Sequence, residues 1–147
     1  MAITAAQREQ LKAFATGDID RAQELNNAST EEDRLQYHKL VGALFAILLD
    51  NHFQGDTSPQ AIAAFVDKIR RDYEAAGQPF NAWAVEGVLR ATAGEEHLFA
   101  ELSGEEIMST QMLVVGRLAI NNPSVRENID QLLDDAEEIV SEWERGE

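Results

Sequence analysis

A chain of 147 residues can form one ordinary domain with its own core and is too short for two. Its composition, 44% hydrophobic and 27% charged, is typical of a globular protein and excludes the apolar-poor class of disordered chains. A net charge of −15 disfavours direct binding to nucleic acid or anionic lipid, since both are also negatively charged. Because the chain has no cysteine, disulfides, thiolate metal sites and cysteine nucleophiles are excluded.

Capping residues and helix breakers alternate along the whole chain, and strand patterns are absent. The first half predicts helices over about 4–15, 18–25, 31–52 and 58–77. The second half predicts a helix over about 79–94, a helical turn or two over 95–101 and a helix over 104–120. Ser124 with Glu127 then resembles a capping box that would open a terminal helix. We therefore expect an all-α fold with six or seven helices in one domain over residues 1–147.

Two segments are apolar around most of the helix circumference, Leu40–Leu49 and Met108–Ile120. Such helices are buried inside a domain or against another subunit. We expect the helices that contain them, about 31–52 and 104–120, to lie at the centre with the amphipathic helices packed around them. A homodimer is an alternative way to hide both surfaces.

The three histidines are the candidates for a catalytic or metal site. His38 and His52 are separated by roughly 21 Å on one helix, too far to share an ion, and His97 lies beside Glu101 in an acidic segment. We expect His38 to be buried and to form a hydrogen bond. We expect the negative end of the helix to favour the charged form of His52. Linear catalytic motifs are absent, so we assign no catalytic, metal-binding or cofactor-binding residue and expect no cofactor. A metal- or ligand-dependent helical-bundle enzyme built around His38, His52 or His97 remains the alternative to a non-enzymatic protein.

The C-terminal third carries most of the net charge. Residues 101–147 hold twelve carboxylates against three arginines and no lysine, which leaves −9 of the total of −15. Their apolar residues still recur at helical spacing, so the terminal helix presents an acidic outer face that could bind a basic partner or serve solubility alone. The predicted partner-binding residues are Asp130, Asp134, Asp135, Glu137, Glu138, Glu142 and Trp143. Trp83 and Trp143 each fall in an apolar stripe, which predicts a core position for both, and a contact anchor is the alternative for Trp143.

These observations favour a small acidic, non-enzymatic helical protein that acts through protein–protein contact, as an adaptor, inhibitor or assembly factor for a basic partner. A third possibility is a DNA mimic, which shares the acidic face but would compete with duplex DNA for one basic protein. We expect neither direct nucleic-acid binding nor membrane association. We expect a cytoplasmic location, because the N-terminus lacks a signal-peptide pattern and the longest apolar run, Leu40–Leu49, is too short to span a bilayer.

Overall fold

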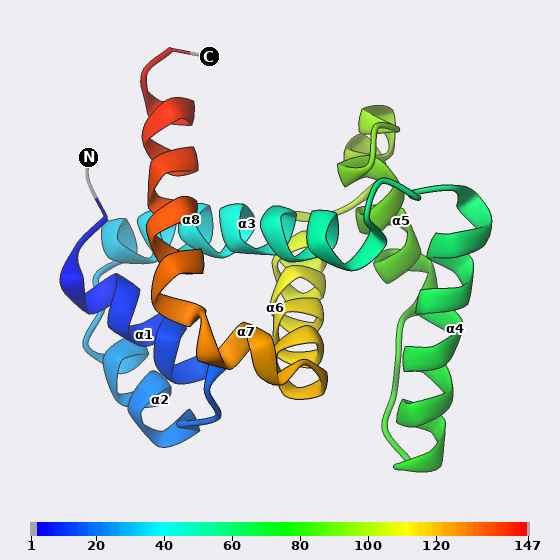
Figure 1. The fold of residues 1–147 in the computed structure, drawn as a ribbon, viewed down its shortest axis with the longest axis horizontal. Coiled ribbons are helices and arrows are strands. Elements are labelled where there is room, and N and C mark those ends of the chain that lie inside the picture. The colour runs from blue at the N-terminus through cyan, green and yellow to red at the C-terminus, as the bar shows by residue number, and fades with distance from the viewer. Residues whose placement is uncertain (1–2, 147) are drawn as a thin grey trace. The chain divides into compact units, whose positions relative to one another are not determined.

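The structure, a computed structural model, describes residues 3–146, and every regular element in that range is a helix. In chain order these are α1 (Ala5–Ala15), α2 (Ile19–Asn27), α3 (Glu31–Phe53), α4 (Pro59–Ala75), α5 (Ala82–Thr92), the 3-10 helix η1 (Glu96–Glu101), α6 (Gly104–Asn121), α7 (Pro123–Glu127) and α8 (Ile129–Glu144) (Figure 1). The predicted all-α class is confirmed for the described residues. Within this range no helix is both long and apolar enough to cross a membrane.

The prediction of six or seven helices was wrong, because nine helical segments occur between residues 3 and 146. One expected helical turn is the separate element η1, and the expected terminal helix is divided into α7 and α8 at Asn128. The backbone N–H of Asn128 donates to the carbonyl of Ser124 at 3.1 Å, and its side-chain amide donates to the same carbonyl at 2.8 Å. A side chain that bonds the nearby backbone in this way competes with the helix. Ser124 and Glu127 consequently lie within α7 and do not cap the terminal helix.

Two other predicted helix starts are confirmed by hydrogen bonds. At the start of α3, the backbone N–H of Asp33 donates to Thr30 Oγ1 and the backbone N–H of Thr30 donates to Asp33 Oδ2, both at 3.1 Å. Ser103 and Glu106 make the same reciprocal pair before α6, at 2.9 and 3.0 Å. Each capping box satisfies two backbone groups that the first turn of a helix leaves unpaired. These boundaries are therefore determined by residues only three positions apart.

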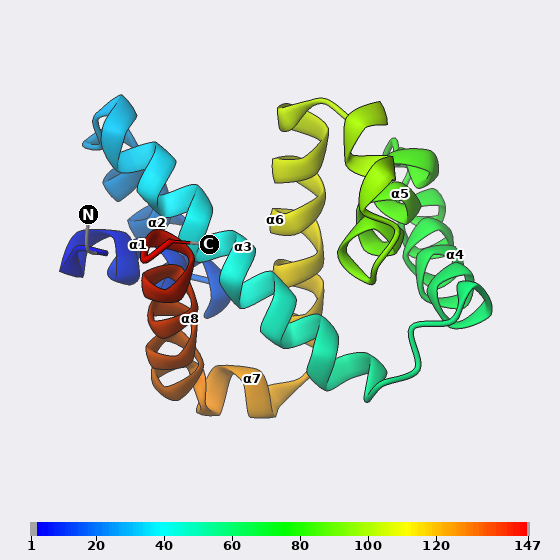
Figure 2. The ribbon, with the colours of Figure 1, turned by 90° about the horizontal axis from the view of Figure 1, so that it is seen from above.

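The chain divides into two compact units, of which the first reaches Leu48 and resumes at Met112. It holds α1, α2, α7, α8 and the adjoining parts of α3 and α6. Within this unit α1 contacts both α2 and α8, and α8 crosses α3 (Figures 1 and 2). Its largest fully buried side chains are Leu11, Leu40, Val41, Leu44, Phe45, Val114, Val115, Leu133 and Val140.

The second unit, Leu49–Gln111, contains α4, α5, η1 and the remaining parts of α3 and α6. Here α4 and α5 pack side by side, and α5 also contacts η1 (Figure 2). The core between these elements is formed by Ile62, Val66, Ile69, Val85, Val88 and Leu89. The ring of His52 lies 4.9 Å from the ring of Phe53 and 4.7 Å from that of Phe65, measured between centroids.

The two segments predicted to be central differ in burial. Most side chains of Leu40–Leu49 are buried, as expected. In α6, Val114, Val115, Leu118 and Ala119 are buried, but Ile120 is 69% exposed. Both helices contribute residues to each unit, and the prediction of one domain over residues 1–147 stays a prediction.

Trp83 was wrongly predicted to be core, since 60% of its surface is exposed. The buried face of α5 is formed instead by Ala84, Val85, Val88, Leu89 and Ala91. Trp83 shares the opposite face of α5 with Glu86, Gly87 and Arg90, which lie three, four and seven positions further along the helix.

Candidate protein-binding face of the C-terminal helix

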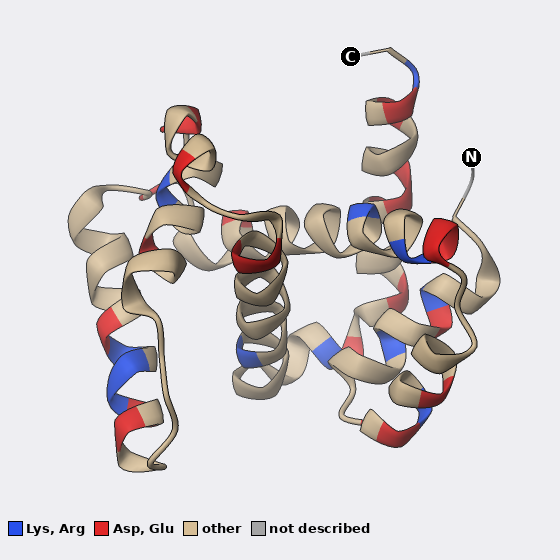
Figure 3. Ribbon diagram, turned by 180° about the vertical axis from the view of Figure 1, so that it is seen from behind, with Lys and Arg blue, Asp and Glu red and all other residues tan. Residues whose placement is uncertain are grey.

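The terminal helix α8 is strongly amphipathic. Ile129, Leu133, Ala136 and Val140 are its buried residues, and their spacing of four, three and four positions forms one stripe along the helix. Most of its exposed residues are carboxylates, and α8 contains no lysine or arginine (Figure 3). The carboxylates differ in whether another helix of the chain offers them a cation or a hydrogen-bond donor.

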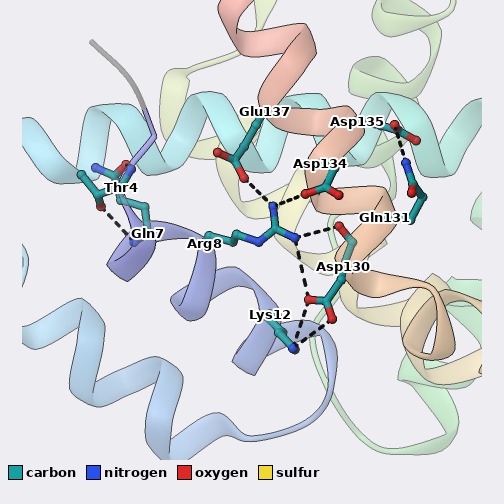
Figure 4. Close-up of polar contacts among 9 residues, drawn as sticks. All are labelled: Thr4, Gln7, Arg8, Lys12, Asp130, Gln131, Asp134, Asp135 and Glu137. Atoms are coloured by element: carbon teal, nitrogen blue, oxygen red, sulfur yellow. Dashed lines mark hydrogen bonds and ion pairs between the residues drawn. The ribbon is translucent and has the colours of Figure 1, made fainter.

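Three of the predicted partner-binding carboxylates are bound by α1 of the same chain. Arg8 Nη1 donates to Asp134 Oδ1 at 2.7 Å and to Glu137 Oε2 at 2.5 Å (Figure 4). Its Nη2 donates to the backbone carbonyl of Asp130 at 2.8 Å, and Lys12 Nζ lies 3.0 Å from the Asp130 carboxylate. One arginine thus connects two successive turns of α8 to α1.

Arg8 is well placed to hold this contact, because its side chain is only 25% exposed. Burial alone would lower the pKa of Arg8, but the hydrogen bonds and charges of Glu137 and Asp134 outweigh it, and the pKa lies above the ordinary arginine value. The guanidinium therefore stays charged. It neutralises a part of the acidic face within the chain itself.

A fourth acidic residue of α8 is bound by α3. Gln36 Nε2 and Lys39 Nζ each lie 3.2 Å from Glu144 Oε2. These hydrogen bonds, from Gln36 first and then Lys39, lower the pKa of Glu144 below its ordinary value. The last turn of α8 is thereby joined to the first half of α3.

The remaining predicted carboxylates, Asp135, Glu138 and Glu142, point to solvent. All three are exposed, and within residues 3–146 they take part in no ion pair. Asp135 lies on the side of α8 away from Arg8 and accepts a hydrogen bond from Gln131 at 3.0 Å (Figure 4). Their spacing of three and four positions places them on one side of the helix. We refer to Asp135, Glu138 and Glu142 as the outer acidic strip.

Trp143 follows directly after this strip, in the last turn of α8, and is 47% exposed. A half-exposed indole offers apolar area to a partner without needing a rearrangement of the core. Of the seven predicted residues, three are therefore paired with cations of α1, and the other four form no ion pair within residues 3–146.

Sequence reasoning missed Arg8 and Lys12. Their spacing of four positions on the N-terminal helix is a visible signal, since it places two cations on one face. Nothing in the sequence, however, says which acidic helix that face meets. Only the packing of α1 against α8 identifies the partner.

The three histidines lie in α3 and η1. Among the described residues no group of three or more His, Asp and Glu side chains could hold a metal ion. His38 is exposed on α3, which corrects the expectation that it is buried. Burial and then the charge of Lys68 lower the pKa of His52, so the neutral form is favoured and the expected effect of the helix end does not prevail. His97 lies exposed in η1.

No model of a known protein family matches this chain, no characterised protein is significantly similar to it in sequence, and no solved structure is significantly similar to it. The function must therefore be inferred from the surface chemistry of the chain itself.

Proposed function

We propose that this is a non-enzymatic binding protein that acts on a basic protein partner through the outer acidic strip and Trp143, as an adaptor, inhibitor or assembly factor. The observation that supports this most directly is the division of the α8 carboxylates. Arg8 and Lys12 pair with Asp130, Asp134 and Glu137, but Asp135, Glu138 and Glu142 are left without a cation in the described chain.

The outer acidic strip costs the isolated protein free energy. Like charges one helical turn apart destabilise a helix by about 0.2–0.5 kcal/mol per pair. A basic partner would replace that repulsion with attraction and would accelerate association at low salt. Trp143 adds an aromatic anchor at one end of the strip, the kind of residue that contributes most to interface affinity.

The test is a charge reversal confined to the strip. We would immobilise the wild-type protein and the Asp135→Lys/Glu138→Lys/Glu142→Lys variant, expose both to extract of the source cells, and quantify the retained proteins by mass spectrometry. We expect the variant to retain the specific partner at least about tenfold less, because attraction becomes repulsion at three positions.

A matched control distinguishes the effect of the outer acidic strip from the effect of net charge. Glu9→Lys/Asp50→Lys/Glu127→Lys changes three exposed carboxylates that form no ion pair in the described part of the chain, and it alters the net charge by the same amount. We expect this control to retain the partner. An equal loss in both variants would show that only overall charge matters, and no loss in the strip variant would overturn the proposed face.

Native mass spectrometry of gently purified protein gives an independent test. A mass above a whole multiple of 16.3 kDa would reveal a retained partner, and the multiple itself would distinguish the monomer from the homodimer. We expect the excess mass to be that of a basic protein.

A further inference from the structure

The second unit contains a pocket on the surface where α5 meets η1, with a volume of about 210 Å³. Its lining residues from α5 are Ala82, Trp83, Glu86, Gly87 and Arg90, and those from η1 and the residue after it are Leu98, Glu101 and Leu102. This volume is smaller than the ~300–1,000 Å³ of a typical small-molecule site. It suits a single side chain better than a metabolite or cofactor.

One wall of the pocket is an exposed indole. Trp83 shows 60% of its surface to solvent, although tryptophan is among the largest apolar side chains. Leu98 and Leu102 provide further apolar surface, and Gly87 leaves room against Leu102 because it has no side chain. The pocket can therefore take the apolar stem of a ligand as well as its polar end.

The charged residues around the pocket leave a negative surplus. Arg90 donates from Nε and Nη2 to the two carboxylate oxygens of Glu95, at 2.7 and 2.8 Å, and also lies 3.5 Å from Glu86. Its guanidinium is thus already engaged and offers little to an anion. Glu101 is exposed and, within residues 3–146, forms no ion pair. Three carboxylates and one arginine give this region a net charge of −2.

We propose that this pocket receives an arginine side chain of the basic partner, stacked on Trp83 and paired with Glu101. A planar guanidinium is attracted to the face of an indole, and it can pair with a carboxylate at the same time. The compact ammonium of lysine lacks that planar stacking surface. The inference rests on the proposed function only in assigning the arginine to a protein partner.

The experiment uses the full chain and three short peptides, Ac-Gly-Arg-Gly-NH2, its lysine analogue and its citrulline analogue. Citrulline has nearly the shape of arginine but is neutral. We would titrate each peptide into nitrogen-15-labelled protein and follow the indole signal of Trp83 and the backbone amide of Gly87. The Trp143→Phe variant assigns the indole signals. We expect saturable shifts with the arginine peptide, weaker binding of the lysine peptide and at least about tenfold weaker binding of the citrulline peptide.

Two variants test the named contacts. Glu101→Gln and Trp83→Leu should each raise the dissociation constant of the arginine peptide about fivefold. Glu105→Gln removes an equal charge from an exposed residue of the same unit outside the pocket, so we expect it to bind like the wild type.

Equal shifts with the citrulline peptide, or unchanged affinity in Glu101→Gln, would overturn the proposal. Equal affinity for the lysine peptide would overturn the assignment to arginine. Shifts confined to Trp143 would place the peptide on α8, in which case this pocket fails as an arginine site while the proposed function stands. If the arginine peptide binds in the pocket but charge reversal of the outer acidic strip leaves capture unchanged, the arginine site stands and the proposed role of the strip is overturned.

Discussion

At the scale of single residues, Arg8 determines which carboxylates of α8 are paired within the chain. It binds Asp134 and Glu137 and the backbone of Asp130, so that half of the predicted carboxylates serve the contact between α1 and α8. Arg8→Gln should have two opposite effects. Stability should fall by about 1 kcal/mol because several partly exposed ion pairs are lost, which corresponds to roughly 3 °C in Tm.

Binding of the proposed basic partner should strengthen in the same Arg8→Gln variant, because Asp134 and Glu137 lose their internal cation while Asp130 keeps Lys12. Thermal unfolding and the extract capture described above measure the two effects separately. A matched change at Arg145, which follows α8 and forms no ion pair within the described residues, should leave Tm nearly unchanged. Weaker capture by Arg8→Gln would contradict this prediction. It would mean that carboxylates released from Arg8 do not add to the attraction exerted by the outer acidic strip.

Two helical glycines make a second comparison at this scale. An added Cβ at Gly87 would meet Leu102 at 3.5 Å, an ordinary contact, whereas one at Gly116 would lie 3.3 Å from the ring of Phe14. Alanine is better than glycine in a helix by about 0.8–1.0 kcal/mol. We expect Gly87→Ala to raise Tm by roughly 3 °C and Gly116→Ala to raise it less or to lower it, because Phe14 must move. Differential scanning calorimetry of both variants tests this order, and equal Tm values would contradict the steric argument.

At the scale of helices, the end of α8 is attached to α3 through Glu144. Hydrogen bonds from Gln36 and then Lys39 lower its pKa below the ordinary value of 4.5. A carboxyl group with a lowered pKa in the folded state stabilises that state fully above its unfolded pKa, and the contribution is lost as the pH falls through the folded pKa. Glu144→Gln should therefore flatten the decline of Tm below about pH 4.5.

The control for this prediction is Glu142→Gln, which removes the same charge from the same turn of α8 without removing an ion pair in residues 3–146. Thermal melts between about pH 3 and pH 7 compare the two variants with the wild type. A decline in Glu144→Gln as steep as that of the wild type would show that the link to α3 does not contribute to acid unfolding.

Most helices could be predicted because their ends depend on neighbours in sequence. Thr30 with Asp33, and Ser103 with Glu106, interact across one turn, and the chain geometry of a helix brings such residues together in any context. The break at Asn128 was harder to predict. Ser124 and Glu127 have the residue types of a capping box, and only the bonds that Asn128 makes back to Ser124 show that the pattern is not used.

At the scale of the whole molecule, the net charge of −15 opposes compaction and favours binding to cations. The Debye length is about 30 Å at 0.01 M salt and about 8 Å at 0.15 M. Added salt should therefore raise Tm, because it screens repulsion among carboxylates that outnumber the cations by 27 to 12. The same salt should weaken capture of the proposed basic partner. Thermal melts and capture assays over this range of salt test the expected rise in Tm and the expected loss of capture. A Tm that falls with salt would mean that ion pairs such as those of Arg8 outweigh the general repulsion.

The sequence by itself determined the helical class, the positions of most helices and the excess of acid near the C-terminus, because these follow from composition and from contacts within one turn. Only the tertiary structure decided which carboxylates of α8 are free, since Arg8 and Asp130 are 122 residues apart and meet through packing. It also decided that Trp83 lines a pocket, because the other wall of that pocket is formed by Leu98, Glu101 and Leu102, which follow α5 in the chain. Helix ends depend on hydrogen bonds across three or four residues. The pairing of surface charges, in contrast, depends on which distant segments pack together.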